Sequence, residues 1–308
     1  MIAARRTQGG VAVVMAVLVV ALATSAATYM LWQQSLWVRQ VENLNGRAQA
    51  DAIARAAVGW ASVILAEDDP AIDHLGETWA RRIPPFPAEQ AQVAGMMFDE
   101  QAKFNVNNLA REGGVAPQDF VAFQRLLAAL GLPAGLAEAV VDWLDADGEV
   151  MQPNGAEDSY YLALDPPYRT AGRRIVELAE LARVKGFDAD IVARLAPFVT
   201  ALPEETPVNV NTAPVQVLQA LVPDVSAEEM KRVVEQRKTK PFQSREEFVR
   251  AFSRSRSTSV APQIDVKSRY FSAEATVSLG RVVVAYRALF QRSDRRLPAL
   301  LVVSQVAI

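Results

Sequence analysis

The feature that most constrains this chain is a stretch near its N-terminus, residues 7–38, that contains no charged side chain. Within it, residues 11–31 are long enough to cross the hydrocarbon core of a bilayer as a helix, which takes about 20 residues. Arg5 and Arg6 stand just before the stretch, and the positive-inside rule holds such residues in the cytoplasm. The sequence therefore predicts one membrane span, with the bulk of the chain on the opposite side.

A cleaved secretory signal peptide is the main alternative, because the small residues 23–27 offer a cleavage site. Helical character continues beyond that point, however. Residues 32–66 contain no proline, and their apolar residues recur every three or four positions, as in an amphipathic helix. We predict one continuous helix over residues 11–66, with its first half in lipid and its second half packed on a domain.

The inventory of reactive side chains excludes several kinds of site. The 308 residues include no cysteine and one histidine, so disulfides, thiolate zinc sites and cysteine nucleophiles are ruled out. His74 follows Asp73 and is best explained as a polar residue in a turn. The net charge of −3 gives no general attraction to nucleic acid or acidic lipid. We do not expect the chain to be an enzyme, because a hydrolase that used Glu157 or Asp158 would lack a nucleophile–base pair.

Strand signals occur in two regions that lie far apart in the chain. The predicted strands are residues 92–98, 104–107, 271–278, 282–290 and 300–306. The last three form an antiparallel meander, because apolar and polar residues alternate and short turns separate them. Asp68, Asp69 and Pro70 end the long helix, and residues 81–87 are interpreted as a rigid polyproline-like link.

A helical block, residues 117–252, separates the two strand regions and contains an internal repeat. An apolar helix, a tight Gly/Pro turn and another helix occur three times, in residues 126–144, 178–199 and 217–237. We therefore predict an α+β fold, in which a long N-terminal helix packs on an antiparallel sheet and a large all-α domain of helix–hairpin–helix-like units is inserted. The predicted boundaries are 1–10 for a leader, 11–66 for the helix, 67–108 with 263–308 for the sheet domain, and 109–262 for the insertion.

The sharpest candidate for a site is an acidic stretch around the end of one predicted helix. Asp142, Asp145 and Asp147 belong to it, and Glu157 and Asp158 follow after a loop. The helix dipole disfavours unneutralised carboxylates at a helix C-terminus. Carboxylates gathered across a flexible loop suit Ca²⁺, which takes about six to eight oxygen ligands in loose geometry. A solvated acidic loop explains the pattern equally well, and both interpretations stay open.

Residues 208–214 and the helix pair after them resemble the helix–hairpin–helix module of DNA-uptake receptors, with Asn211 or Thr212 as the predicted helix cap. That module holds the phosphate backbone through glycine amides. Here the hairpin contains Pro223 and Asp224 and no glycine, so we favour a structural role and expect no nucleic-acid partner. Basic residues in 231–240 and 250–256 keep a membrane-anchored DNA receptor as the alternative. The amides of residues 104–108 are also interpreted as structural.

The N-terminal pattern resembles the prepilins of the type IV pilin superfamily: a short basic leader, a glycine, and an apolar helix that continues into an amphipathic half. The resemblance implies that a prepilin peptidase cuts after Gly10 and leaves Val11 as the new N-terminus. Pilins usually carry Glu at the fifth mature position, where this chain has Met15. That Glu is thought to neutralise a neighbour's N-terminal ammonium in lipid. Its absence suits a subunit at the end of a filament.

The whole pattern resembles the K-type minor pseudopilins of bacterial type II secretion systems. The matching segments are residues 104–109, 142–147, 155–162, 167–169 and 208–213. The resemblance implies a single-pass inner-membrane protein with a cytoplasmic N-terminus and a periplasmic C-terminal domain. It also implies a non-catalytic place at the pseudopilus tip, beside I-type and J-type minor pseudopilins. Calcium would be bound in the inserted domain, with Asp142, Asp145, Asp147, Glu157 and Asp158 as candidate ligands.

Overall fold

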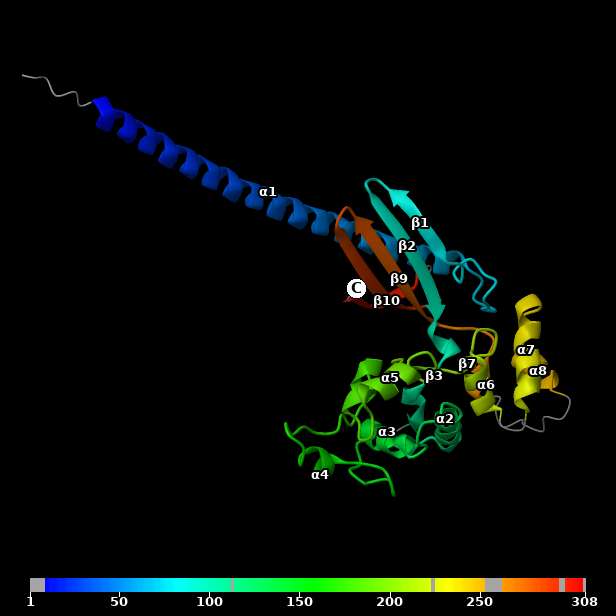
Figure 1. The fold of residues 1–308 in the computed structure, drawn as a ribbon. Helices are drawn as coiled ribbons and strands as arrows, with labels where there is room; N and C mark the ends of the chain where they lie inside the picture. The colour runs from blue at the N-terminus through cyan, green and yellow to red at the C-terminus, as the bar shows by residue number, and fades with distance from the viewer. Residues whose placement is uncertain (1–8, 112–113, 223–224, 253–261, 294–296, 307–308) are drawn as a thin grey trace, which may run out of the picture.

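The computed structural model describes residues 9–111, 114–222, 225–252, 262–293 and 297–306, so most of the predicted leader lies outside the described residues. One long helix, α1, packs against a five-stranded sheet and projects beyond one end of it (Figure 1). A region of shorter helices lies beyond the other end of the sheet. The first half of α1 projects away from everything else as a free stem. The predicted α+β arrangement is therefore confirmed.

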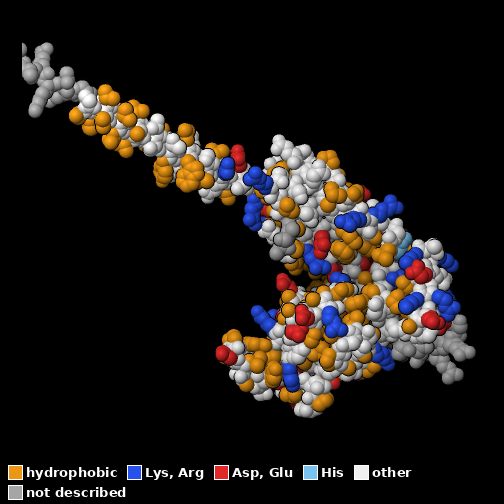
Figure 2. All heavy atoms as spheres, in the orientation of Figure 1, with side chains coloured by type: hydrophobic (Ala, Val, Ile, Leu, Met, Phe, Trp, Pro, Cys, Tyr) orange, Lys and Arg blue, Asp and Glu red, His pale blue; other side chains and the backbone are white. Residues whose placement is uncertain are grey.

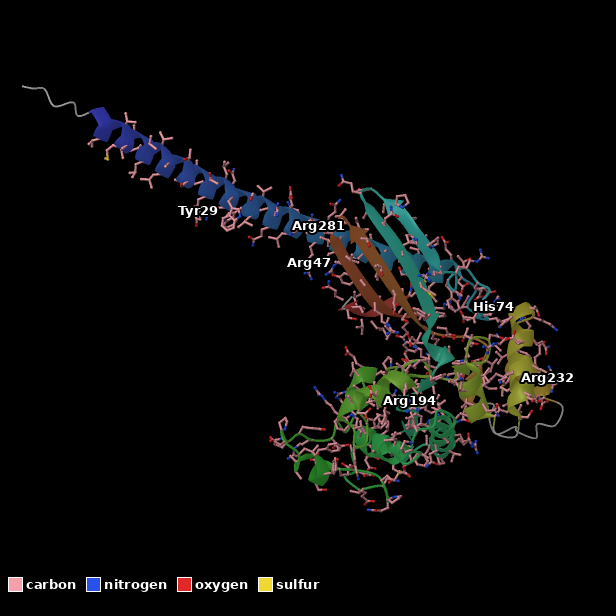
Figure 3. All side chains as sticks on the ribbon, viewed as in Figure 1. Tyr29, Arg47, His74, Arg194, Arg232 and Arg281 are labelled. Carbon is pink, nitrogen blue, oxygen red and sulfur yellow. The ribbon has the colours of Figure 1, made fainter. Side chains whose placement is uncertain are left out.

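Helix α1 runs from Gly9 to Glu67 without interruption. Of the described helices, it is the one that is long and apolar enough to cross a membrane, by length and composition. Hydrophobic side chains cover the stem, and Tyr29 lies on its surface (Figures 2 and 3). The hydroxyls of Thr24 and Thr28 donate to carbonyls one turn earlier, at 2.7 and 2.8 Å, which satisfies them within an apolar surrounding.

The second half of α1 packs across the sheet, as its apolar spacing predicts. Its buried positions recur every three or four residues, so they line one face of the helix: Ala50, Ala54, Val58, Ala61 and Leu65. This face meets the alternate side chains of three strands: β2 (Ala91–Asp99), β9 (Tyr270–Leu279) and β10 (Val282–Gln291). The predicted meander is completed by β11, Ala299–Val306.

The proline-rich segment, which we interpreted as a polyproline link, is instead a strand. Residues Ile83–Ala88 form β1, which pairs antiparallel with β2 at one edge of the sheet. Proline is tolerated there because an edge strand has one side that needs no backbone N–H. The local extended geometry was therefore expected, but its partner strand was not.

The helical region has a hydrophobic core of its own. Its described helices are α2 (Pro117–Ala129), α3 (Leu136–Leu144), α4 (Asp158–Tyr161), η3 (Leu178–Arg183), α5 (Ala189–Leu195), α6 (Val215–Leu221), α7 (Ala227–Thr239) and α8 (Arg245–Arg250). Two of the three predicted repeats are helix pairs, α2/α3 and α6/α7; the first member of the remaining pair is a 3-10 helix, η3. The predicted cap was also wrong, because α6 starts after Pro214 without a side-chain cap.

Buried asparagines join the start of this region to distant segments. Asn107 accepts from the backbone N–H of Ile175 at 2.9 Å and donates to the carbonyls of Ile175 and Leu202. Asn105 and Asn108 make similar bonds with residues 200–206. The structural interpretation of these amides is confirmed, although they bridge chain segments rather than only one turn. The predicted boundaries at 109 and 262 stay predictions, and the packing places Phe104 on the helical side.

Candidate metal centre

The acidic stretch forms a compact group at the end of α3. Asp142 lies in the last turn of α3, Asp145 is its C-cap residue, and Asp147 follows in the next turn. Glu157 is the N-cap residue of the short helix α4, at the other end of the intervening loop. Gly148, with a φ of +76°, allows the tight turn that brings the loop back.

Asp142 closes this loop rather than joining the group of carboxylates. Its side chain is fully buried, and its oxygens accept from the backbone N–H of Met151 at 3.1 and 3.2 Å. A Cβ atom at position 155 would lie 2.2 Å from Asp142 Oδ2, so glycine is required there for the loop to approach this closely. Burial raises the pKa of Asp142, and the two backbone N–H groups of Met151 and Ala156 counteract that rise.

Asp145, Asp147 and Glu157 converge, each with a carboxylate oxygen within 4.8 Å of the others. Asp145 and Glu157 are 7% and 6% exposed. Among the described residues, Asp145 Oδ1 and Glu157 Oε1 find no hydrogen-bond partner. Burial, followed by repulsion between the carboxylates, raises the pKa of Asp145 to about 6 and that of Glu157 to about 7. Buried acceptors without donors are destabilising unless a cation or water satisfies them.

Asp158 lies at the rim of this group and already has partners. Its carboxylate accepts from the backbone N–H of Thr170 at 3.0 Å and from Arg169 Nη1 at 2.6 Å, and these bonds, the first above all, lower its pKa. Asp145, Glu157 and Asp158 line an open hollow of about 360 Å³. Asp145 and Glu157 therefore border solvent through this hollow, although their two orphaned oxygens are themselves buried. A hard cation with carboxylate and water ligands therefore fits Asp145, Asp147 and Glu157, with Asp142 as a supporting residue.

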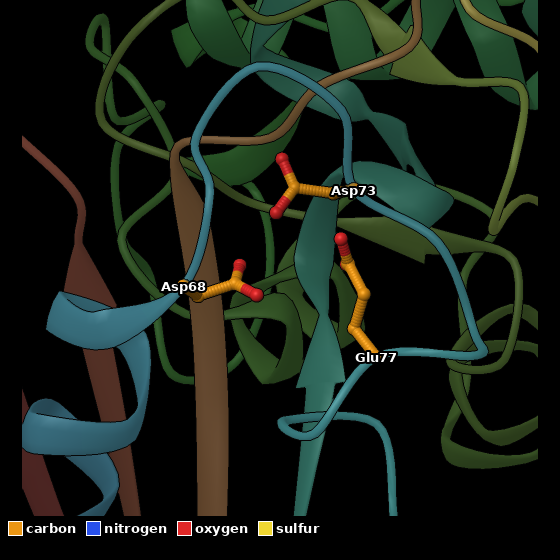
Figure 4. Close-up of side chains that lie close together, drawn as sticks. All are labelled: Asp68, Asp73 and Glu77. Carbon is orange, nitrogen blue, oxygen red and sulfur yellow. The ribbon is translucent and has the colours of Figure 1, made fainter.

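A second group of carboxylates, which the sequence analysis missed, lies where α1 ends. Asp68, Asp73 and Glu77 approach one another from the end of α1 and the loop after it (Figure 4). Here the cation is a guanidinium: Arg292, at the end of β10, donates to Asp68 at 2.6 Å and to Asp73 at 2.7 Å. Oε2 of Glu77 accepts from both the backbone N–H of His74 and the indole N–H of Trp79. This Arg292 cluster joins the segment after α1 to the end of β10.

The comparisons with known proteins agree with this architecture. Residues 102–204 and 208–267 match two family models described as type II secretion system (T2SS), protein K. The chain is 36% identical over 290 residues to the type II secretion system protein K of Pseudomonas aeruginosa, covering 90% of this chain and 86% of that protein. It is 33% identical to the protein K of Aeromonas hydrophila, covering 96% of each. The chain belongs to the type II secretion system protein K family.

The fold agrees with that of a chain in a solved type 2 secretion system complex. The structure resembles a chain in the crystal structure of the GspK-GspI-GspJ complex from the enterotoxigenic Escherichia coli type 2 secretion system. The TM-score is 0.78 at 25% identity, over 87% of this chain and 100% of that chain. The resemblance to K-type pseudopilins drawn from the sequence is confirmed, and it supports a minor pseudopilin role.

The helix pair α6/α7 has a structural use within this protein K fold. Arg237 of α7 is buried and donates to the carbonyls of Val210 and Ala213. Asn211 bonds to the backbone N–H and carbonyl of Phe242, at 2.9 and 3.0 Å. These side chains hold α7 against the segment before α6, so they are not available to a phosphate backbone. Pro223 and Asp224 of the hairpin lie outside the described residues.

Proposed function

We propose that this chain is a non-catalytic minor pseudopilin at the tip of the type II secretion pseudopilus. It would start or cap assembly there and support protein export across the outer membrane. The observation that carries the proposal is the likeness of nearly the whole chain to its counterpart in the GspK-GspI-GspJ complex. I-type and J-type minor pseudopilins are accordingly the proposed partners.

The shape of the molecule provides a physical reason for a position at the tip. The stem leaves one end of the sheet, and the helical region lies beyond the other end (Figure 1). With the stem anchored in the inner membrane and the rest in the periplasm, the helical region would occupy the space in which a further subunit would stack. Met15 adds a second reason, because this subunit lacks the carboxylate that would neutralise a neighbour's N-terminal ammonium. Further subunits would then be added only at the membrane end of the pseudopilus.

Calcium is part of the proposal. Asp145, Asp147 and Glu157 would hold the ion, and Asp142 would fix the loop that brings them together. Asp158 would remain at the rim with Arg169. The ion would supply positive charge to oxygens that otherwise repel one another, and so it would stabilise the loop between α3 and α4. Its role is structural, not catalytic.

The test of the proposed function is co-purification of the full-length chain from detergent-solubilised membranes. We expect the I-type and J-type minor pseudopilins of the same secretion system to be retained together with it. Deletion of the chain's gene should abolish secretion while leaving the export substrates in the periplasm. Retention of nucleic acid that is lost at high salt, without either pseudopilin, would favour the DNA-receptor alternative instead.

Processing at the predicted leader gives a separate prediction. Replacing Gly10 with a bulky residue should leave the leader attached, because the prepilin peptidase would no longer cut before Val11. Intact-mass analysis of the protein from membranes measures this directly, and Gly9 provides a neighbouring control position. A mature protein that starts near residue 28 would instead indicate signal-peptide cleavage, and the stem would then be absent from the mature molecule.

A further inference from the structure

The two edges of the sheet have opposite chemistry. Strand β1 carries Pro84, Pro85 and Pro87, which have no backbone N–H to offer to another strand. Strand β11, at the other edge, has the sequence ALLVVSQV, with no proline and no charge. Natural proteins usually block a long apolar edge with charges, proline or a covering segment. One edge of this sheet is therefore blocked, and the other is suited to pairing.

Strand β11 is also uncovered on both of its faces. Helix α1 packs over β2, β9 and β10, and all eight residues of β11 are exposed. Val303 lies opposite Ala288 and faces the α1 side, while Val302 lies opposite Leu289 and faces the other side. Their side chains are 38% and 44% exposed. Among the described residues, no segment pairs with the outer edge of β11.

The surroundings of this edge are shaped to receive an extended chain. On the side away from α1, a hollow of about 490 Å³ separates the sheet from the helical region. Val302 and Ser304 line it from β11, and Leu178 lines it from η3. Val176, just before η3, also borders the hollow and is 66% exposed. A strand added to β11 would place its alternate side chains in this hollow while its backbone pairs with the free edge.

We propose that β11 is the edge to which a neighbouring pseudopilin adds an extended segment, so that the sheet continues into the partner. The inference rests on the proposed function and names the surface of contact within it. The added segment of the partner presents apolar side chains on both of its faces, because both faces of β11 are apolar. It carries a carboxylate at the end nearest the membrane, where Arg47 and Arg281 are both exposed (Figure 3). Arg47 reaches β11 itself, with Nη2 3.4 Å from Gln305 Oε1.

A second copy of this chain does not fit the edge in antiparallel pairing. The start of β10 lies against the second half of α1, close to the stem: a Cβ atom at Gly46 would be 3.5 Å from Val282 Cγ2. Strand β11 is antiparallel to β10, so it runs toward the free half of α1. Antiparallel pairing of two β11 strands would reverse the direction of one entire molecule. The two stems would then point in opposite directions, and one membrane could not hold both.

The experiment introduces a charge at the edge. Val302→Lys and Val303→Lys should each reduce the co-purified partner pseudopilins by about tenfold, since an edge lysine opposes strand addition. Val283→Lys is the matched control: this valine is also exposed, at 46%, but lies in the interior strand β10. Melting temperatures close to that of the wild-type chain would establish that each variant is folded. Wild-type retention of partners by both edge variants would overturn the inference; failure of the wild-type chain to retain any partner would instead overturn the proposed function.

Cross-linking tests the same contact positively. The chain has no cysteine, so Val303→Cys introduces a single thiol, and the periplasm allows disulfides to form. We expect a disulfide to single cysteines scanned along the strands of the I-type or J-type partner, in an every-second-residue pattern. A disulfide-linked homodimer of this variant would overturn the inference. An absence of cross-links to either partner across the scan would do so as well.

Discussion

Replacing Arg292 with methionine is expected to lower the free energy of unfolding by about 3–5 kcal/mol, the cost of breaking a buried ion pair from one side. Arg292 is 8% exposed and donates to both Asp68 and Asp73, and Asp73 is completely buried. Methionine fills much of the space but leaves the two carboxylates without a counter-charge. Urea unfolding of the part of the chain beyond the stem, followed by circular dichroism, measures the change.

The matched control is Lys238→Met, which removes an ion pair on the surface. Lys238 and Glu235 are 2.7 Å apart with both side chains well exposed, so this change should cost at most about 1 kcal/mol. Adding Asp68→Asn and Asp73→Asn to Arg292→Met should recover part of the lost stability, because no uncompensated charge remains. A loss below about 1 kcal/mol for Arg292→Met alone would mean that water already compensates these carboxylates.

The Arg292→Met deficit should also depend on pH. Burial raises the pKa of Asp73 to about 7 even with Arg292 present, and removing the guanidinium raises it further. A carboxyl whose pKa is higher in the folded state stabilises the fold when protonated, and this contribution is lost as the pH rises through the folded pKa. For Asp73 the deficit should therefore change little between about pH 4 and pH 7 and grow above about pH 7, where the wild-type carboxyl ionises beside Arg292 and the carboxyl of the variant has no counter-charge. A deficit that does not grow above about pH 7 would contradict the assignment of the effect to this carboxylate.

Removing calcium from the full chain is the second large effect we expect. A ligand at a hundred times its dissociation constant adds about 2.7 kcal/mol of stability, which corresponds to about 4 °C in melting temperature for a chain of this size. Glu157→Gln should abolish the difference between melting in Ca²⁺ and in chelator. Glu149→Gln is the control, because Glu149 lies in the same loop but outside the group of converging carboxylates. Equal melting temperatures with and without chelator would rule out the metal.

The sign of the pH dependence distinguishes the metal centre from an ordinary acidic loop. The pKa values of Asp145 and Glu157, about 6 and 7, lie above their ordinary values of 3.8 and 4.5. The metal-free protein should therefore lose stability as the pH rises from about 4 to about 7, because the unfolded chain releases these protons at a lower pH than the folded protein does. Calcium needs the ionised carboxylates, so the stabilisation that it adds should grow over the same interval. Melting curves at both ends of the interval, with and without Ca²⁺, measure this.

Much of the architecture follows from local patterns in the sequence. Residues 11–66 form one helix because no proline interrupts them and their apolar spacing changes from all-round in the stem to one-sided on the sheet. The alternation in residues 271–290 makes two strands with one buried face, since each side-chain direction repeats every second residue. The acidic residues around Asp145 identified the candidate metal centre, because carboxylates of like charge close together in the chain need a cation or solvent.

The tertiary structure alone decided which groups meet. Asp68 and Arg292 are separated by 224 positions, and no local pattern pairs them. The same holds for β1, whose proline segment becomes a strand only because β2 lies beside it, and for Asn107, which bonds to residues far along the chain. Within the acidic stretch, the packing gives the carboxylates different partners. Asp142 supports the loop and Asp158 pairs with Arg169. Asp145 and Glu157 each keep one buried oxygen without a hydrogen-bond donor. Backbone preferences act over a few residues and can be read from the sequence, whereas desolvation and charge pairing depend on the complete packed structure.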